Sequence, residues 1–150
     1  MRATFSFPHD RKNMSGSNSS KKGRAPSDPF SELAVKNAKY VKNCVELFMA
    51  GRGIEKIRGF ENFVNLEVLW LNNNKITKLN NLANNFRIKF LYAHDNNIRT
   101  LFGDIEEFKF LTMMTLFNND ITDLDKQLEI LSKFQYLEQL DMYGNPVAGE

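Results

Sequence analysis

Residues 66–76 read LEVLWLNNNKI, in which spaced leucines are followed by a run of asparagine. Leu69 and Leu71 are two residues apart, a spacing that predicts a short strand with one buried face. Asn74 and Ile76 follow at the point where the chain has to bend away from that strand. The pattern is Leu-x-x-Leu-x-Leu-x-x-Asn-x-Ile, and it recurs along most of the chain.

Five registers of this pattern follow one another at nearly regular intervals. From Asn74 onward its asparagine recurs after 22, 23 and 26 residues. The other four registers are Cys44, Leu47, Met49 and Ile54; Ile88, Leu91, Ala93, Asn96 and Ile98; Leu111, Met114, Leu116, Asn119 and Ile121; and Leu137, Leu140, Met142, Asn145 and Val147. Units of this size stack to bury a common core. The sequence therefore predicts an α/β solenoid over residues 44–150, with one parallel sheet built from one strand per repeat.

The asparagines at the bends are expected to be structural. An inward-pointing amide can satisfy backbone groups that the bend leaves unpaired, and such groups are costly when buried. We expect a ladder of Asn74, Asn96, Asn119 and Asn145, with Arg52 at the equivalent place of an atypical first repeat. The apolar residues after each bend are expected to fill the convex side: Ile57, Phe60 and Phe63; Leu79, Leu82 and Phe86; Leu101, Ile105 and Phe108; and Leu124, Leu128, Leu131 and Phe134.

The chain before the repeats divides into two parts. Residues 1–29 carry a formal charge of +4, against −2 for residues 30–150. Residues 1–28 have little apolar surface to bury, so we expect a disordered basic tail, either solvated or docked on an acidic surface. Asp28 and Pro29 suit a helix start, and residues 29–43 are expected to form a helix that caps the solenoid. The sequence has no helical cap after Pro146, which suggests a longer protein or an end covered by a partner.

These five registers resemble the leucine-rich-repeat family, specifically its class with 22-residue repeats. The resemblance extends from Cys44 to Glu150, and the segments LWLNNNKI and LYAHDNNI are similar to those of ciliary and axonemal members. It implies a non-catalytic protein-binding scaffold. The expected location is cytoplasmic, as a component of the axoneme of a cilium or flagellum. The same class contains phosphatase regulators and spliceosomal A-prime-type proteins. A phosphatase-type regulatory subunit and a nuclear ribonucleoprotein component therefore remain alternatives.

The outward-pointing positions of the strands form the candidate binding surface, which we call the concave face. It comprises the third, fifth and seventh positions of each repeat: Glu46, Val68, Phe90, Met113 and Gln139; Phe48, Trp70, Tyr92, Thr115 and Asp141; and Ala50, Asn72, His94, Phe117 and Tyr143. Protein interfaces concentrate aromatic side chains and Met at their centres. The members expected to contact a protein partner are Phe48, Val68, Trp70, Phe90, Tyr92, His94, Met113, Phe117 and Tyr143. Two alternatives are that the aromatics pack on one another, or that the register is shifted by one residue.

Other kinds of site receive little support from the sequence. With the second and eighth positions added, the charged residues of the concave face are Glu46, Glu67, Lys89, Asp95, Glu138 and Asp141. Aromatic platforms without basic residues hold phosphates poorly, so nucleic acid is not expected there. The sequence also has no metal-ligand spacing, cofactor motif or catalytic constellation, and no apolar run long enough to cross a membrane. The resemblance to axonemal members implies that the basic tail lies on an acidic surface such as tubulin.

Overall fold

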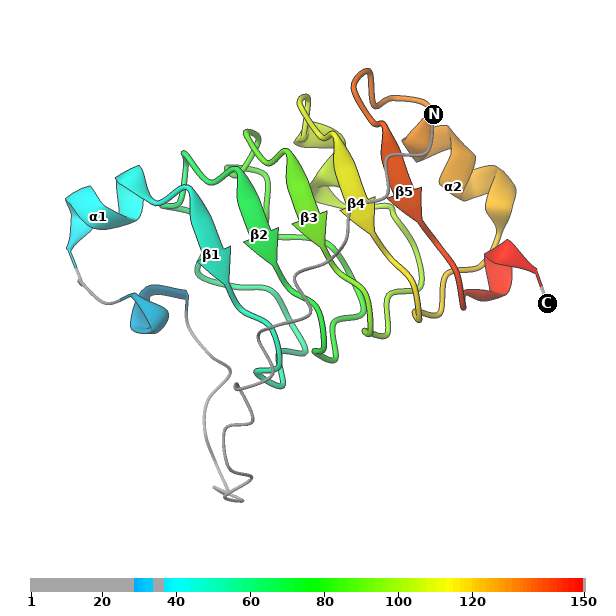
Figure 1. Cartoon of the computed structure of the whole chain (residues 1–150), viewed down its shortest axis with the longest axis horizontal. Helices are drawn as coiled ribbons and strands as arrows, with labels where there is room; N and C mark the ends of the chain where they lie inside the picture. Colours follow the sequence, from blue (N-terminus) through cyan, green and yellow to red (C-terminus); the bar gives the residue numbers. More distant parts are fainter. Residues whose placement is uncertain (1–28, 34–36, 150) are drawn as a thin grey trace.

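The computed structural model describes residues 29–33 and 37–149 (Figure 1). Five strands form one parallel sheet in chain order, β1 (Glu46–Phe48), β2 (Val68–Trp70), β3 (Phe90–Tyr92), β4 (Met113–Thr115) and β5 (Gln139–Asp141). The third and fifth positions of successive repeats are register partners across the whole sheet. The fourth positions of the first four repeats (Leu47, Leu69, Leu91 and Met114) are buried. The predicted solenoid and its register are therefore confirmed, and the shift by one residue is excluded.

Short helices accompany the sheet within the described residues. They are the α-helices α1 (Ala38–Asn43) and α2 (Leu124–Leu131) and the 3-10 turns η1 (Pro29–Glu32), η2 (Asp104–Glu107) and η3 (Pro146–Ala148). In Figure 1, α1 lies beside β1 at one end of the sheet and α2 lies beside β5 at the other end. The strands between them are joined mostly by irregular segments, so the sheet is the main regular feature of the fold.

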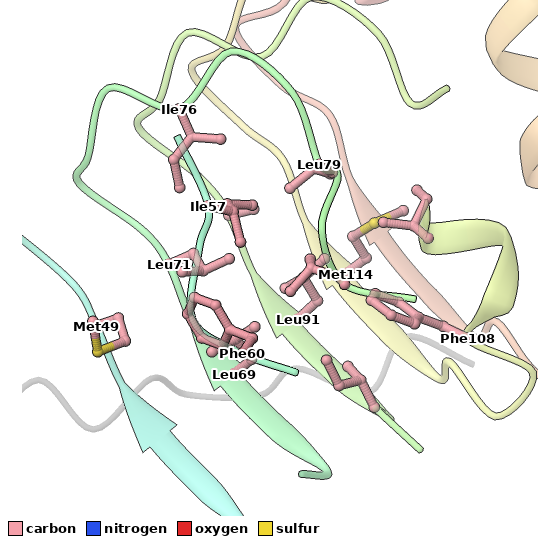
Figure 2. Packing of buried hydrophobic residues seen from close by; sticks show 14 of the residues in the cluster. Met49, Ile57, Phe60, Leu69, Leu71, Ile76, Leu79, Leu91, Phe108 and Met114 are labelled. Atoms are coloured by element: carbon pink, nitrogen blue, oxygen red, sulfur yellow. The ribbon is translucent and has the colours of Figure 1, made fainter. Parts of the chain in front are cut away.

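The core lies between the sheet and the segments that return behind it. Side chains of Leu69, Leu91 and Met114, from three successive strands, are fully buried. Figure 2 shows them packed with Phe60 and Phe108, which come from return segments. Burying a side chain of this size stabilises a fold by about 1.5–3 kcal/mol. Because each strand residue packs on the repeats before and after its own, the core is continuous along the solenoid.

The asparagines of the bends join each repeat to its neighbour. Oδ1 of Asn96 accepts a hydrogen bond from the backbone N–H of Ile76 at 3.1 Å. Its Nδ2 donates to the carbonyl oxygens of Leu71 at 2.9 Å and Ala93 at 3.2 Å. Equivalent bonds are made by Asn74, Asn119 and Asn145. Each amide thus satisfies backbone groups of its own repeat and of the preceding one.

The convex side differs from the prediction at Phe86. This ring is 42% exposed, whereas Asn85 beside it is fully buried. Nδ2 of Asn85 donates to the carbonyl oxygens of Phe60 at 2.9 Å and Phe63 at 3.1 Å. The prediction at Phe86 was wrong because the core position of Phe63 recurs after the same 22 residues, which leads to Asn85.

A second difference lies in α2. Leu124 and Leu128 were predicted to fill the core, but they are 49% and 48% exposed, and Gln127 and Ile130 are buried instead. Oε1 of Gln127 accepts from the N–H of Leu101 at 2.8 Å, while its Nε2 donates to the carbonyl oxygen of Thr122 at 2.9 Å. A buried side-chain amide that satisfies two backbone groups therefore takes the place that apolar periodicity assigned to leucine.

The predicted helix over residues 29–43 is not continuous. The turn η1 ends at Glu32, and α1 begins after Asn37, whose backbone is extended (φ −142°, ψ 158°). The side chain of Asn37 accepts from the N–H of Tyr40 at 2.8 Å, so Asn37 starts a new helix as its N-cap. Leu33 and Val41 are buried and belong to the same core as the repeats. The predicted basic tail, residues 1–28, lies outside the described residues.

Replacing Asn96 with Ala tests the bonds between repeats. The change leaves the buried Ile76 N–H unpaired and takes one of two hydrogen bonds from each of the carbonyl oxygens of Leu71, Ala93 and His94. Since a buried polar group left unpaired costs about 1–3 kcal/mol, we expect Asn96→Ala to lower the free energy of unfolding in urea by about 3 kcal/mol. Asn97, which is exposed, is the control, and Asn97→Ala should change stability by less than about 0.5 kcal/mol. Equal losses would contradict this account of the bends.

Candidate functional site

Five rings follow one another across the concave face. Phe48, Trp70 and Tyr92 are register partners on β1, β2 and β3. His94 and Phe117 lie two residues beyond the ends of β3 and β4. Side chains alternate between the two faces of a strand, so burial of the leucines places these rings on the opposite, outward side. We call these five residues the aromatic row.

The rings of the aromatic row stack on one another. The centroids of Trp70 and Tyr92 are 3.6 Å apart with planes within 4°, and those of Phe48 and Trp70 are 5.0 Å apart at 18°. Trp70 is thus covered by a ring from each neighbouring strand, and it presents its edge outward. His94 stacks on Phe117 at 4.3 Å and meets Tyr92 edge-on at 6.5 Å. The aromatics do pack on one another, yet every member of the row is partly or largely exposed.

Two polar contacts hold the row in place. Nε1 of Trp70 donates to Oε1 of Glu46 at 3.0 Å, which fixes the indole against β1. Nδ1 of His94 and Oγ1 of Thr115 share a hydrogen bond of 2.7 Å, whose direction depends on the tautomer of the ring. Thr115 occupies the fifth position on β4, where β1, β2 and β3 carry rings, and it is buried beneath His94 and its neighbours. The row is therefore preorganised rather than free to rearrange.

Burial favours the neutral forms of the two titratable rings of the row, His94 and Tyr92. Loss of solvent lowers the pKa of His94 below its usual 6.5, and the carboxylates of Asp95 and Asp141 oppose this effect. Burial, together with the charge of Glu46, raises the pKa of Tyr92. At neutral pH the row itself is uncharged, and the charge of the concave face comes from the acidic and basic side chains around it.

The remaining predicted contact residues lie on the same face. Val68, Phe90 and Met113 are register partners at the third positions, and all three are half-buried. Tyr143 lies just beyond β5 and is 79% exposed. The structure thus brings the nine predicted contact residues together on one surface, while their role in binding stays a prediction.

Sequence reasoning missed a second group of exposed rings outside the concave face. Phe110 and Tyr136 are 49% and 55% exposed and stack with their centroids 6.4 Å apart. Each directly precedes the first leucine of a repeat, Leu111 or Leu137, and that shared offset is the signal that could have revealed them. This pair offers an aromatic surface with which the concave face can be compared.

Three further features bear on function in the described part of the chain: groups of metal ligands, helices able to span a membrane, and the free cysteine. Within residues 29–33 and 37–149, no three His, Cys, Asp or Glu side chains are grouped so that they could hold a metal ion. None of the helices described there has both the length and the apolar character needed to cross a membrane. Cys44 is half-buried, its Sγ donates to the carbonyl oxygen of Glu46 at 3.3 Å, and burial raises the pKa of its thiol. That thiol is therefore protonated and weakly nucleophilic at neutral pH.

Comparisons with known proteins agree with this architecture. Residues 42–84 match a family model for leucine rich repeats (2 copies). The chain is similar to acidic leucine-rich nuclear phosphoprotein 32 family member A of Drosophila melanogaster, with 33% identity over 105 residues, 65% of this chain and 40% of the relative. The corresponding protein of Drosophila pseudoobscura pseudoobscura is also 33% identical, over 96 residues, with 36% of its length covered. The chain thus spans well under half the length of these curated relatives.

Solved structures show the same fold. A chain of the Drosophila melanogaster SNF/U2A' complex has a TM-score of 0.63 and 29% identity, with 70% of this chain and 61% of that chain covered. Internalin C2 from Listeria monocytogenes has a TM-score of 0.64 and 20% identity, with 73% of this chain and 47% of that chain covered. At that identity the internalin shows the fold alone.

The depressed pKa of His94 predicts a pH dependence of stability. The folded pKa lies below the usual 6.5, so the unfolded state binds more protons as the pH falls through this range. The stabilisation is complete above about pH 6.5 and is lost as the pH falls toward the folded pKa. We expect the NMR titration of the His94 ring to have its midpoint below 6.5. His94→Gln should reduce the drop in melting temperature between neutral and mildly acidic pH, and an unchanged drop would contradict the assignment.

Proposed function

Starting from a leucine-rich-repeat solenoid as the fold of this chain, we propose that it is a non-catalytic scaffold that binds another protein through its concave face. The observation that carries the proposal is the aromatic row, which is stacked, partly exposed and continuous over four strands. Aromatic side chains are the residues that most often dominate the free energy of protein association. Val68, Phe90 and Met113, half-buried at the third positions, add apolar surface beside the row.

Preorganisation of the row strengthens this proposal. Ordering a flexible side chain at an interface costs roughly 0.5–1.5 kcal/mol, and this cost is subtracted from the binding free energy. Trp70 is already held by rings on both sides and by its bond to Glu46, and His94 is held by Phe117 and Thr115. A partner would therefore meet rings already in their bound positions, which favours tight association for a given contact area.

The setting of this scaffold is better supported in the nucleus than in an axoneme. The matched curated relatives carry the word nuclear in their name, and one structural neighbour is a chain of a two-protein complex, SNF/U2A'. These likenesses favour the nuclear ribonucleoprotein component as the biological role. Neither the ciliary or flagellar axoneme nor tubulin receives support from them, and the same holds for the phosphatase-type regulatory subunit.

In a ribonucleoprotein, this chain would contact the protein component. The concave face and its margins, by which we mean the second and eighth positions of each repeat, carry five carboxylates and one ammonium group among the described residues. This negative charge disfavours direct contact with RNA phosphates. Such a role therefore requires a folded or folding partner that itself makes the RNA contacts. The negative charge of the concave face favours contact with a protein over contact with nucleic acid in any assembly that contains this chain.

Removing two anchors tests whether the concave face binds the partner. We expect Trp70→Ala with Phe90→Ala to weaken capture of the native partner by about tenfold or more, because truncating such anchors commonly costs about 2 kcal/mol or more. Capture is measured with tagged full-length chain after crosslinking in the native cell. The control is Phe110→Ala with Tyr136→Ala, which removes two exposed rings outside the concave face. Undiminished capture by the first variant, with its far-UV circular dichroism intact, would refute the proposal.

The location of a tagged full-length chain separates the two settings. Accumulation in the nucleus with loss of that enrichment in the Trp70→Ala, Phe90→Ala variant is expected for a nuclear assembly, since retention then depends on the partner. Enrichment along cilia or flagella would instead favour the axoneme. The comparison uses live-cell imaging of both variants at matched expression levels.

A further inference from the structure

The concave face carries an excess of negative charge. With its margins it holds Glu46, Glu67, Asp95, Glu138 and Asp141 against the single cation Lys89, a formal charge of −4 for these described residues. Nζ of Lys89 lies 3.0 Å from Oε1 of Glu67, so that cation is already paired. The other four carboxylates have no salt bridge to a Lys or Arg of the described chain. A partner would therefore encounter four carboxylates that no Lys or Arg of residues 29–33 and 37–149 pairs with.

Three of these carboxylates flank the aromatic row at both of its ends. Oε1 of Glu46 accepts from Trp70 at the β1 end. At the other end, Asp95 and Asp141 lie close enough to His94 to oppose the fall in its pKa. Oδ1 of Asp95 accepts from Asn118 at 2.9 Å and Oδ1 of Asp141 accepts from the N–H of Tyr143 at 3.0 Å, so both side chains are oriented.

The row between these carboxylates is apolar but does not offer open ring faces at its centre. Trp70 is covered on both sides by Phe48 and Tyr92. A cation gains most over an exposed ring face, and ring edges carry the positive part of the aromatic quadrupole. The covered rings therefore suit aliphatic or aromatic side chains of a partner. Cations of the partner are better accommodated at the carboxylates on either side.

We propose that the occupant of the concave face is a basic segment of another protein, with apolar side chains that contact the aromatic row and Arg or Lys side chains that reach Glu46, Asp95 and Asp141. This inference rests on the proposed function and names the chemistry of its partner. Opposite charge across an interface speeds association and selects partners. The negative charge of the face disfavours acidic segments, nucleic acids and anionic lipid surfaces in the same way.

The first experiment measures binding of synthetic peptides to the full chain by fluorescence anisotropy. The probe alternates Leu and Arg, and two matched probes replace its Arg by Glu or its Leu by Ser. We expect the Leu–Arg probe to bind, the Leu–Glu probe not to bind, and the Ser–Arg probe to bind more weakly. Affinity for the Leu–Arg probe should fall as salt increases, because exposed charges are screened. Equal binding of the Leu–Arg and Leu–Glu probes would overturn the proposal.

A charge-matched pair of variants shows whether the face itself is responsible. Asp95→Asn with Asp141→Asn removes two charges from the face while keeping an acceptor oxygen at each position, and we expect about tenfold weaker binding of the Leu–Arg probe with a smaller salt dependence. Asp125→Asn with Glu129→Gln removes the same charge from exposed positions on α2 and should leave binding unchanged. Equal losses in both variants would overturn the proposal, since they would reflect total charge alone.

Two further outcomes separate this inference from its alternatives. Residues 1–29 of this chain are themselves basic, with a formal charge of +4. If removing residues 1–24 tightens binding of the probe about tenfold, the occupant is this chain's own segment, and assignment to another protein is overturned. If the native partner needs Trp70 but is indifferent to Asp95→Asn with Asp141→Asn, this inference fails while the proposed function stands. A native partner that does not need Trp70 overturns both.

Discussion

The structure depends on the hydrogen bonds that a buried asparagine amide makes at the bend of each repeat after the first. A chain that turns away from a three-residue strand leaves backbone groups inside the protein without partners, and water cannot reach them. Each of Asn74, Asn96, Asn119 and Asn145 supplies an acceptor and donors for these groups. Because the bonds reach the preceding repeat, they also set the offset between repeats. Leucine packing would hold the layers together without them, but it would not fix the bend.

That offset is what builds the concave face. Parallel pairing without slip places Phe48, Trp70 and Tyr92 at the same height on three strands, close enough for their rings to stack. The same register brings Asp141 of β5 close enough to His94 to influence its pKa. The repeat therefore determines the shape of this surface. Its chemistry comes from the outward-pointing residues, which the repeat pattern does not specify. Each strand is thus constrained by burial on one side, while the proposed function places recognition on the other.

Most of the fold could be predicted from the sequence because the repeat pattern itself shows where each repeat begins and which residues point inward. Once asparagine and leucine positions are aligned, strand alternation assigns inward and outward residues without reference to tertiary contacts. Prediction failed where a polar side chain entered the core. Asn85 and Gln127 are buried because their amides satisfy carbonyl and N–H groups of neighbouring segments, and hydropathy cannot anticipate that need. The prediction of a continuous helix over residues 29–43 failed for a related reason. The side chain of Asn37 accepts a hydrogen bond from the backbone and starts a new helix there. The binding role of the concave face depends on a second molecule, and one sequence does not contain it.

The most direct test of the central claim places a photoreactive phenylalanine at single positions of the full chain. Phe117, in the aromatic row, is compared with Phe110, which is exposed outside the concave face. Crosslinking in the native cell followed by mass spectrometry identifies what each position touches. The account predicts efficient crosslinks from position 117 to a protein segment rich in basic and apolar residues, and few from position 110. Crosslinks that arise at position 110 and are missing at position 117 would contradict it.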